Sequence, residues 1–151
     1  MWEKYHSAQH LTTSRDRQAG YTLGLQEAGI PLAEELIKVG DFKYSSGYAR
    51  MKELHNLGVT AVFAANDMMA IGAIRAVEDM GKRIPDVVAV TGFDDIMMAS
   101  LIKPALTTVS QPTYRMGVIA AELLLDQVTG RGNREPETIV LKPNLIIRES
   151  C

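Results

Sequence analysis

The sequence predicts an α/β protein with a mainly parallel, doubly wound sheet. Two observations lead to this fold class. Short apolar runs alternate along the chain with longer segments in which apolar residues recur at helical spacing. Asp41, Asp67 and Asp94 also follow one another at intervals of about 26 residues, close to the length of one strand and helix together. Strands that alternate with helices through short loops are typical of parallel neighbours in one sheet.

The predicted strands are short apolar or β-branched runs bounded by turn residues. The runs 61–64 and 87–90 are continuously apolar, which is typical of strands buried on both faces of a sheet. The run 106–109 is β-branched throughout its second half. The last two candidates are expected to pair with each other at an edge. The six candidates lie at 36–39, 61–64, 87–90, 106–109, 138–141 and 145–147.

Four segments are predicted to be helices, and each stops at a glycine, the residue that most easily adopts the left-handed backbone closing a helix. The first has Ser14 as a candidate N-cap, and its Gly20 and Gly24 would let another element approach closely. The third is apolar nearly all round, which is typical of a helix covered on more than one side. The helices are predicted at 16–28, 45–57, 68–80 and 113–128, and they stop at Gly29, Gly58, Gly81 and Gly130.

The composition of the chain excludes several classes of protein. Its 151 residues include 16 Lys and Arg against 18 Asp and Glu, whereas a domain that binds nucleic acid through its own surface usually has a basic excess. No apolar run approaches the roughly 18 residues of a membrane helix, and the N-terminus lacks the apolar stretch of a signal peptide. The single cysteine, Cys151, fits a reducing compartment. We therefore expect a globular, cytoplasmic protein without membrane partners.

Polar and aromatic side chains follow four of the predicted strands, at the edge where ligands of open parallel sheets bind. Arg17, at the start of the first helix, adds a planar guanidinium with five N–H donors. The carboxylates can accept hydrogen bonds from ligand hydroxyls, Arg17 can donate to ligand oxygens, and Phe42 can stack on the C–H face of a ring. This set favours a neutral polyhydroxy ligand. The strand-end residues are Asp41, Phe42, Asn66, Asp67, Asp94, Asp95 and Gln111.

Several of these residues also have simpler structural interpretations. Asn66 or Asp67 could cap the helix that follows them by accepting its free N–H groups, and Asp95 could cap the next short segment in the same way. Phe42 could belong to the core, although its polar neighbours favour a loop. Arg17 could be an ordinary solvent-exposed helix residue. Asp94 has no such alternative.

Motifs of enzymes and cofactor sites are missing from the sequence. It contains no P-loop, no glycine-rich dinucleotide motif and no nucleophile elbow. His6 and His10 have the spacing of two metal ligands on a helix, but no third ligand lies near them in the sequence. A general base at Asp67 or Asp94 would need an activating partner, and no His, Cys or Lys is expected at that edge. We therefore expect no enzyme activity, no cofactor and no metal.

Six segments stand in the order and spacing of a known family. They are residues 14–21 (SRDRQAGY), 39–42 (VGDF), 65–73 (ANDMMAIGA), 90–95 (VTGFDD), 104–112 (PALTTVSQP) and 143–150 (PNLIIRES). Over roughly residues 12–150, the chain resembles the effector-binding domain of LacI/GalR-family bacterial transcription regulators. The resemblance implies the C-terminal lobe of a periplasmic-binding-protein-like (type I) fold.

The resemblance also implies roles for individual residues. Arg17 looks like the arginine with which the family contacts a sugar, and Phe42 looks like the aromatic residue that stacks on the effector. Asn66 and Asp94 match the amide and the carboxylate that bind effector hydroxyls. Gln111 matches a position at the crossing between the two lobes.

A homodimer interface is implied as well. Met98, Leu101 and Ile102, together with the exposed side of the helix at 68–80, match the region through which relatives form homodimers. Family members bind operator DNA through a helix-turn-helix headpiece, whose pattern this sequence does not contain. We therefore expect residues 12–151 to be a partial effector-binding and dimerisation domain, and residues 1–11 remain an unassigned lead-in.

The expected function is that of a transcriptional repressor controlled by a sugar or similar small molecule. By analogy with the family, the helix at 113–128 belongs to the other lobe, so the chain alone is expected to self-associate, to hold effector weakly and not to bind operator DNA. The alternative is a periplasmic sugar-binding protein of an ABC transporter, which has the same two-lobed fold.

Overall fold

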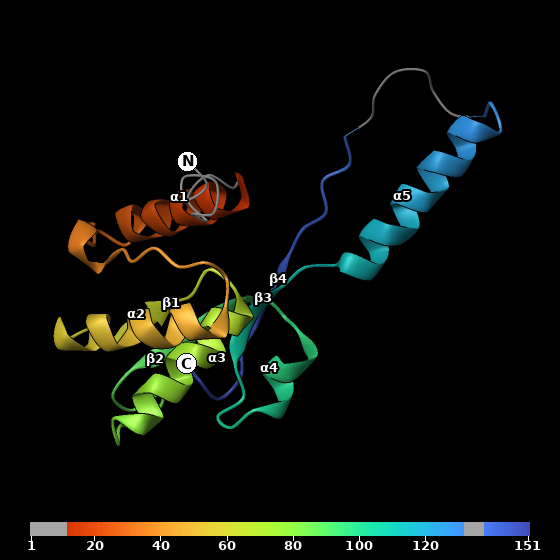
Figure 1. The fold of residues 1–151 in the computed structure, drawn as a ribbon. Helices are drawn as coiled ribbons and strands as arrows, with labels where there is room; N and C mark the ends of the chain where they lie inside the picture. Colours follow the sequence, from red (N-terminus) through yellow and green to blue (C-terminus); the bar gives the residue numbers. More distant parts are fainter. Residues whose placement is uncertain (1–11, 132–137) are drawn as a thin grey trace, which may run out of the picture.

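The structure, a computed structural model, describes residues 12–131 and 138–151 (Figure 1). Its centre is a four-stranded sheet with the strand order β1-β2-β3-β4. The first three strands run parallel, and the last pairs antiparallel with β3. The predicted mainly parallel α/β fold is confirmed. The strands are β1 (Ala61–Phe63), β2 (Ala89–Asp94), β3 (Thr107–Ser110) and β4 (Asn144–Ile146).

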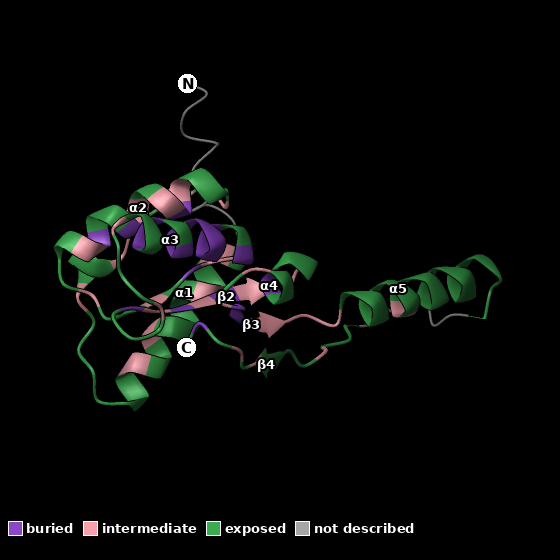
Figure 2. Cartoon of the chain, turned by 90° about the horizontal axis from the view of Figure 1, so that it is seen from below, coloured by how far each residue is buried: buried purple, intermediate pink, exposed green. Residues whose placement is uncertain are grey.

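Helices lie on both faces of this sheet, although α1 buries none of its residues. The helices α2 (Tyr44–Asn56) and α3 (Asp67–Asp79) pack together on one face. The helix α1 (Thr12–Glu27) lies on the other face (Figure 2), where the ring of Tyr21 stacks on that of Phe63 with 6.2 Å between the ring centroids. The sheet therefore lies between two helical layers.

Two glycines allow α2 and α3 to meet backbone to backbone. A Cβ atom added at Gly47 would lie 2.1 Å from the carbonyl oxygen of Met69. One added at Gly72 would lie 2.1 Å from the carbonyl oxygen of Tyr44. No side chain fits at such distances, so only glycine is compatible with this crossing.

The hydrophobic core lies between α2, α3 and the sheet. Helix α3 is covered by α2 on one side and by β2 on another, which confirms the coverage expected from its all-round apolar sequence. The buried core residues are Met51, Leu54, Ala64, Met69, Ala70, Ile71, Ala73, Ile74, Ala76, Val77, Val88, Val90, Ala99 and Leu106.

Three further helices lie largely outside this core, to which they contribute only Ala99. A short 3-10 helix spans Glu34–Leu36, and α4 spans Met97–Leu101. Helix α5 spans Thr113–Val128, as predicted, but buries none of its residues and stands apart from the sheet (Figure 1). Tyr114, for example, is 86% exposed. The apolar side of α5 therefore has no partner among the described residues.

Two predictions about the first strands are wrong. Residues 36–39 do not form a strand, because the 3-10 helix takes up Leu36 and the extended residues after it pair with no other strand. The strand at 61–64 forms, but it is not buried on both faces, since Ala61 and Phe63 are exposed at the edge of the sheet. The strand predicted at 87–90 begins two residues later and continues to Asp94.

The chain ends also differ from the predictions. No strand forms at 138–141, and β4 pairs with β3 instead, where Leu145 faces Val109. Helix α1 begins at Thr12, so Ser14 lies inside the helix and is not its N-cap. The close approach expected at Gly20 and Gly24 is also absent, because, apart from the neighbouring backbone of α1 itself, no atom of the described residues comes within 4 Å of a Cβ built there.

Two searches, for a membrane-spanning helix and for a metal-binding group, apply to the described residues only. None of the helices within 12–131 and 138–151 is long and apolar enough to cross a membrane. In the same ranges, no group of three acidic, His or Cys side chains lies together as a metal site would require. His6, His10 and the unassigned lead-in at 1–11 lie outside the described residues.

Candidate functional site

Three side chains predicted from the sequence meet at the carboxyl ends of the parallel strands. Nη2 of Arg17 donates to Oδ1 of Asp94 at 3.0 Å, and Nε2 of Gln111 donates to the same oxygen at 2.7 Å. No described residue donates to Oδ2 of Asp94, whose side chain is 31% exposed. The structure thus fixes this carboxylate through one oxygen and leaves the other open to a ligand.

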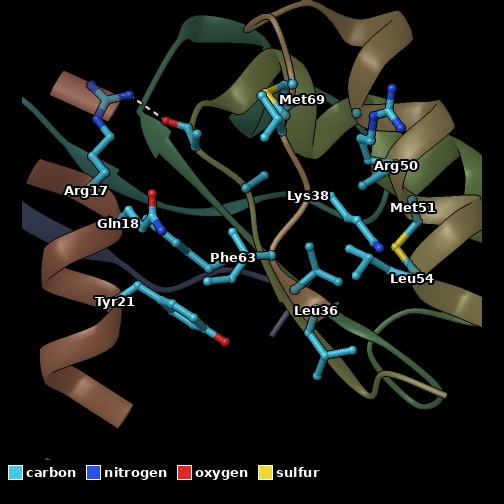
Figure 3. Close-up of a pocket in the computed structure, with 18 of the residues that line it drawn as sticks. Arg17, Gln18, Tyr21, Leu36, Lys38, Arg50, Met51, Leu54, Phe63 and Met69 are labelled. Atoms are coloured by element: carbon cyan, nitrogen blue, oxygen red, sulfur yellow. Dashed lines mark hydrogen bonds between the residues drawn. The ribbon is translucent and has the colours of Figure 1, made fainter. Parts of the chain in front are cut away.

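Arg17 is held in one orientation by three contacts. Besides Asp94, its guanidinium donates through Nη1 to the carbonyl oxygen of Ala65 and lies over the ring of Phe93, 3.9 Å from the centroid (Figure 3 shows Arg17 at the margin of a cavity). Its side chain is only 14% exposed. The interpretation of Arg17 as an ordinary surface residue is therefore wrong. Because Arg17 bridges two strand ends, it also ties α1 to the sheet.

Asn66 caps helix α3 and links it to the neighbouring loop. Its Oδ1 accepts a hydrogen bond from the backbone N–H of Met69 at 2.9 Å, as an N-cap residue does. Its Nδ2 donates to the carbonyl oxygen of Phe42, also at 2.9 Å. An effector hydroxyl at Asn66 would have to share or replace one of these bonds.

Phe42 is a half-buried loop residue and not a member of the core. Its φ of 63° places it in the left-handed region, which is unfavourable for a residue with a bulky side chain. The hydrogen bond from Asn66 to its carbonyl oxygen holds this conformation. The loop thereby keeps the aromatic ring beside the cavity described below.

Asp67 is a buried structural residue and not a helix cap. It is fully buried, and its Oδ1 accepts a hydrogen bond from the hydroxyl of Thr108 while its Oδ2 accepts one from the backbone N–H of Ile96 at 2.8 Å. Burial raises the pKa of the Asp67 carboxyl, and the two hydrogen bonds offset part of that rise. This carboxyl connects α3 to β3 and to the start of α4.

Asp95 does not cap α4 either. Its Oδ1 accepts a hydrogen bond from Nη2 of Arg148 at 2.7 Å, and Nη1 of Arg148 donates to the carbonyl oxygen of Leu106 at 2.8 Å. Asp94 and Asp95 both have positive φ, 112° and 55°, a strained backbone for non-glycine residues. The ion pair with Arg148 fastens this turn, so it helps to aim Asp94 outward.

Sequence reasoning missed the part played by Arg148. It belongs to the motif at 143–150, and because β4 runs antiparallel to β3, it lies beside the start of β3, where its backbone N–H donates to the hydroxyl of Thr107 at 2.8 Å. No signal in the sequence pointed to this ion pair, because the strand before Arg148 was expected to pair with 138–141 and not antiparallel with β3. Phe93 was missed too, because its alternation within β2 did not reveal that Arg17 would lie over it.

A cavity of about 190 Å³ lies beside these residues, between α1, α2, β1 and residues 36–40 (Figure 3). Among the predicted site residues, Arg17 and Phe42 line it, whereas Asn66, Asp94 and Gln111 do not. The predicted residues therefore form two groups, each held together by its own hydrogen bonds. Arg17, Asp94 and Gln111 share one carboxylate oxygen, and Asn66 is bonded to Phe42.

The residues predicted for a dimer interface lie on and after α4. Met98 and Leu101 are exposed, Leu101 by 67%, and Met97 beside them is exposed as well. Ile102 is half-buried and packs against the core. The first two offer an apolar surface, while Ile102 can contribute only part of its side chain.

Comparisons with known proteins point in one direction. The family profile described as a periplasmic binding protein-like domain matches residues 5–151. The HTH-type transcriptional regulator CelR of Thermobifida fusca is 42% identical over 144 residues, which cover 94% of this chain and 42% of the relative. The HTH-type transcriptional repressor PurR of Erwinia tasmaniensis is 44% identical over 140 residues, which cover 91% of this chain and 41% of the relative.

A solved structure agrees with these relatives. The transcriptional regulator CelR–cellobiose complex has a TM-score of 0.84 and 44% sequence identity to this chain, and the match covers 89% of this chain and 42% of that one. The chain thus spans about two fifths of the length of the relatives that it matches.

Proposed function

Because this chain belongs to the periplasmic binding protein-like domain family, in the form found in LacI/GalR-type transcription regulators, we propose that it is the effector-binding and dimerisation part of such a regulator. The regulator is a cytoplasmic repressor, and this part of it carries out no chemical reaction. The regulator names of both curated relatives favour this function over a periplasmic sugar-binding protein of a transporter.

The observation that carries the proposal is the carboxylate of Asp94, held by Arg17 and Gln111 at the carboxyl ends of the parallel strands. A carboxylate fixed through one oxygen can accept ligand hydroxyls through the other at little cost in side-chain entropy. The neighbouring guanidinium can then donate to further ligand oxygens, and the amide oxygen of Gln111 can accept from a ligand hydroxyl.

We infer that the effector is a sugar or a sugar derivative. Asp94 accepts its hydroxyls, Arg17 donates to its oxygens, and Phe42 stacks on its C–H face. Asn66 contributes its amide, and Gln111 lies where the two lobes cross. The structural relative described as a complex with cellobiose supports a ligand of this class.

Residues 12–151 supply one side of the effector cleft under this proposal. The second lobe contributes the remaining ligand contacts, so the chain alone binds effector weakly. Operator DNA is bound through a helix-turn-helix headpiece of the complete regulator, in keeping with the HTH-type names of the relatives.

The regulator acts as a homodimer, and effector binding changes its affinity for operator DNA through the dimer contact. We place the dimer contact at Met98, Leu101 and Ile102, because α4 follows directly after the turn that holds Asp94. Effector binding at that turn can therefore shift the dimer between states of different operator affinity.

The experiment that tests the ligand class is calorimetric titration of the complete regulator with pentoses, hexoses and disaccharides, cellobiose included. Arg17→Ala and Asp94→Ala should each abolish the heat of binding. Asp86→Ala removes an exposed carboxylate that pairs with Arg83 away from the site, and should leave it unchanged. Sugar binding that survives both site substitutions would show that the site is wrongly assigned, and binding of no sugar would contradict the ligand class.

A further inference from the structure

Residues 95–106, here called the α4 connection, join β2 to β3 and contain the proposed dimer contact (Figure 1). Helix α4 has only five residues, too few for a helix to be stable without contacts to the rest of the protein. Ala99 is its one buried residue, whereas Met98 and Leu101 are exposed. The direction in which these two side chains point therefore depends on what holds the α4 connection in place.

Arg148 holds both ends of the α4 connection. Its Nη2 donates to Oδ1 of Asp95, the first residue of the connection, at 2.7 Å, and its Nη1 donates to the carbonyl oxygen of Leu106, the last residue, at 2.8 Å. The N–H of Leu106 in turn donates to the carbonyl oxygen of Ala99 in α4 at 2.7 Å. One planar guanidinium therefore joins the two ends of the connection and lies next to a residue that is bonded to α4.

Glu149 holds the same connection through Ala105. The backbone N–H of Glu149 donates to the carbonyl oxygen of Ala105 at 2.9 Å, and Oε2 of Glu149 accepts from the N–H of Ala105 at 2.8 Å. Nζ of Lys103 lies 3.1 Å from Oε1, but this ion pair is largely exposed and contributes little. The hydrogen bond from Ala105 and the charge of Lys103 hold the pKa of Glu149 below its ordinary value, so the carboxylate is ionised at neutral pH.

The backbone from which these two side chains project is itself fixed to the sheet. Ser150 is fully buried, and its hydroxyl donates to the carbonyl oxygen of Val90 in β2 at 2.6 Å and accepts from the N–H of Thr107 in β3 at 2.8 Å. The carbonyl oxygen of Ser150 also accepts from the N–H of Val90 at 2.8 Å. Arg148 and Glu149 therefore connect the α4 connection to a backbone that is bonded to two strands.

We propose that Arg148 and Glu149 are positioning residues for the homodimer contact, which they hold in place by fastening both ends of the α4 connection to the sheet. The inference rests on the proposed placement of that contact at Met98 and Leu101. In this role neither residue touches the second subunit. Association is tighter when an interface is already ordered before binding. Loss of either anchor therefore lets α4 move and weakens the dimer, although every contacting side chain is still present.

The first test measures the dimer dissociation constant of the complete regulator by sedimentation velocity over a dilution series. The complete regulator is used because the uncovered apolar side of α5 can associate in the chain alone. Arg148→Ala and Glu149→Ala should each raise the dissociation constant at least about tenfold. Glu149→Gln keeps an oxygen that accepts from Ala105 and should raise it no more than about twofold. Arg83→Ala removes an exposed arginine elsewhere and should leave it unchanged.

Hydrogen exchange of backbone amides in the 151-residue chain separates this positioning role from a general loss of stability. In Arg148→Ala, the amide of Leu106, which donates to Ala99, should exchange at least about tenfold faster. The amide of Ala70, which donates to the carbonyl oxygen of Asn66 in the core helix α3, should keep its rate. Equal acceleration at Leu106 and Ala70 would overturn the proposal, because Arg148 would then support the whole domain and not the α4 connection.

The variant Leu101→Glu tests the placement of the dimer contact by itself, because it puts a charge on the exposed side of α4 and leaves both anchors intact. It should weaken the dimer at least as much as Arg148→Ala does. A dimer that is weakened by Leu101→Glu but not by Arg148→Ala would refute the positioning role and leave the proposed interface standing. A dimer that is insensitive to Leu101→Glu would refute the interface, and the positioning role with it.

Discussion

Removal of the Asp67 carboxyl should destabilise the chain strongly. In Asp67→Ala, the hydroxyl of Thr108 and the backbone N–H of Ile96 both lose a buried partner. Each unsatisfied group costs about 1–3 kcal/mol, so the free energy of unfolding should fall by roughly 2–6 kcal/mol. That is a large share of the stability of an ordinary domain. Urea unfolding followed by far-UV circular dichroism measures the change.

A matched variant isolates the hydrogen bonds from the shape of the side chain. In Asp67→Asn, the amide oxygen can accept from the N–H of Ile96, and the amide nitrogen can donate to the oxygen of Thr108, which also accepts hydrogen bonds. This variant should lose at most about 1 kcal/mol. A loss below about 1 kcal/mol in Asp67→Ala would refute the assigned role, because two buried groups cannot lose their partner so cheaply.

The stability of Asp67→Asn and that of the unsubstituted chain should depend differently on pH. Burial raises the pKa of Asp67 above its ordinary value, so folding favours the protonated carboxyl. The stability due to this proton is complete below the ordinary pKa of about 4 and is lost as pH rises through the folded-state pKa. Asp67→Asn cannot ionise. Its stability relative to the unsubstituted chain should therefore rise as pH increases above about 4, and an unchanged difference would contradict the raised pKa.

Three further predictions concern packing and the exposed helices. Gly72→Ala places a Cβ 2.1 Å from a carbonyl oxygen, whereas an ordinary contact is at least 3.4 Å long. The free energy of unfolding in urea should therefore fall by about 2–3 kcal/mol. Gly20→Ala is the control, because its Cβ lies in open space and should not destabilise the chain. Equal effects of the two would contradict the close crossing. Arg17→Ala should expose α1 to limited proteolysis severalfold faster than the exposed control Arg15→Ala, and equal rates would show that Arg17 does not anchor the helix. Leu124→Glu on the uncovered side of α5 should reduce self-association in sedimentation velocity, and an unchanged distribution would exclude α5 from the contact.

The helices that pack in the core could be predicted closely from the sequence, whereas strands without a partner could not. Helices α2 and α3 agree with the predicted bounds within one residue, because Gly58 and Gly81 adopt the left-handed backbone that ends each helix. Residues 36–39 have the composition of a strand, but a strand exists only when a neighbour pairs with it. None of the strands in the described residues pairs with them.

The sequence predicted which residues meet at this edge of the sheet, but not the different roles of the neighbours Asn66 and Asp67. The expectation that residues after parallel strands meet at one edge correctly brought Asp94 and Gln111 together, and Arg17 joins them from α1. It could not tell that Asn66 caps α3 while Asp67 turns inward, since both can cap a helix. Such choices depend on local backbone conformation, which the side-chain pattern does not encode.

The most direct test of the account is the effect of Asp94→Asn on the effector response of the complete regulator. Fluorescence anisotropy measures the affinity for operator DNA with and without a sugar that the regulator binds. We predict that the sugar changes operator affinity by about tenfold or more in the unsubstituted protein. In Asp94→Asn, the affinity without sugar should be unchanged and the response to sugar should be lost. A variant that responds like the unsubstituted protein would contradict the assignment of this carboxylate as the effector-binding group.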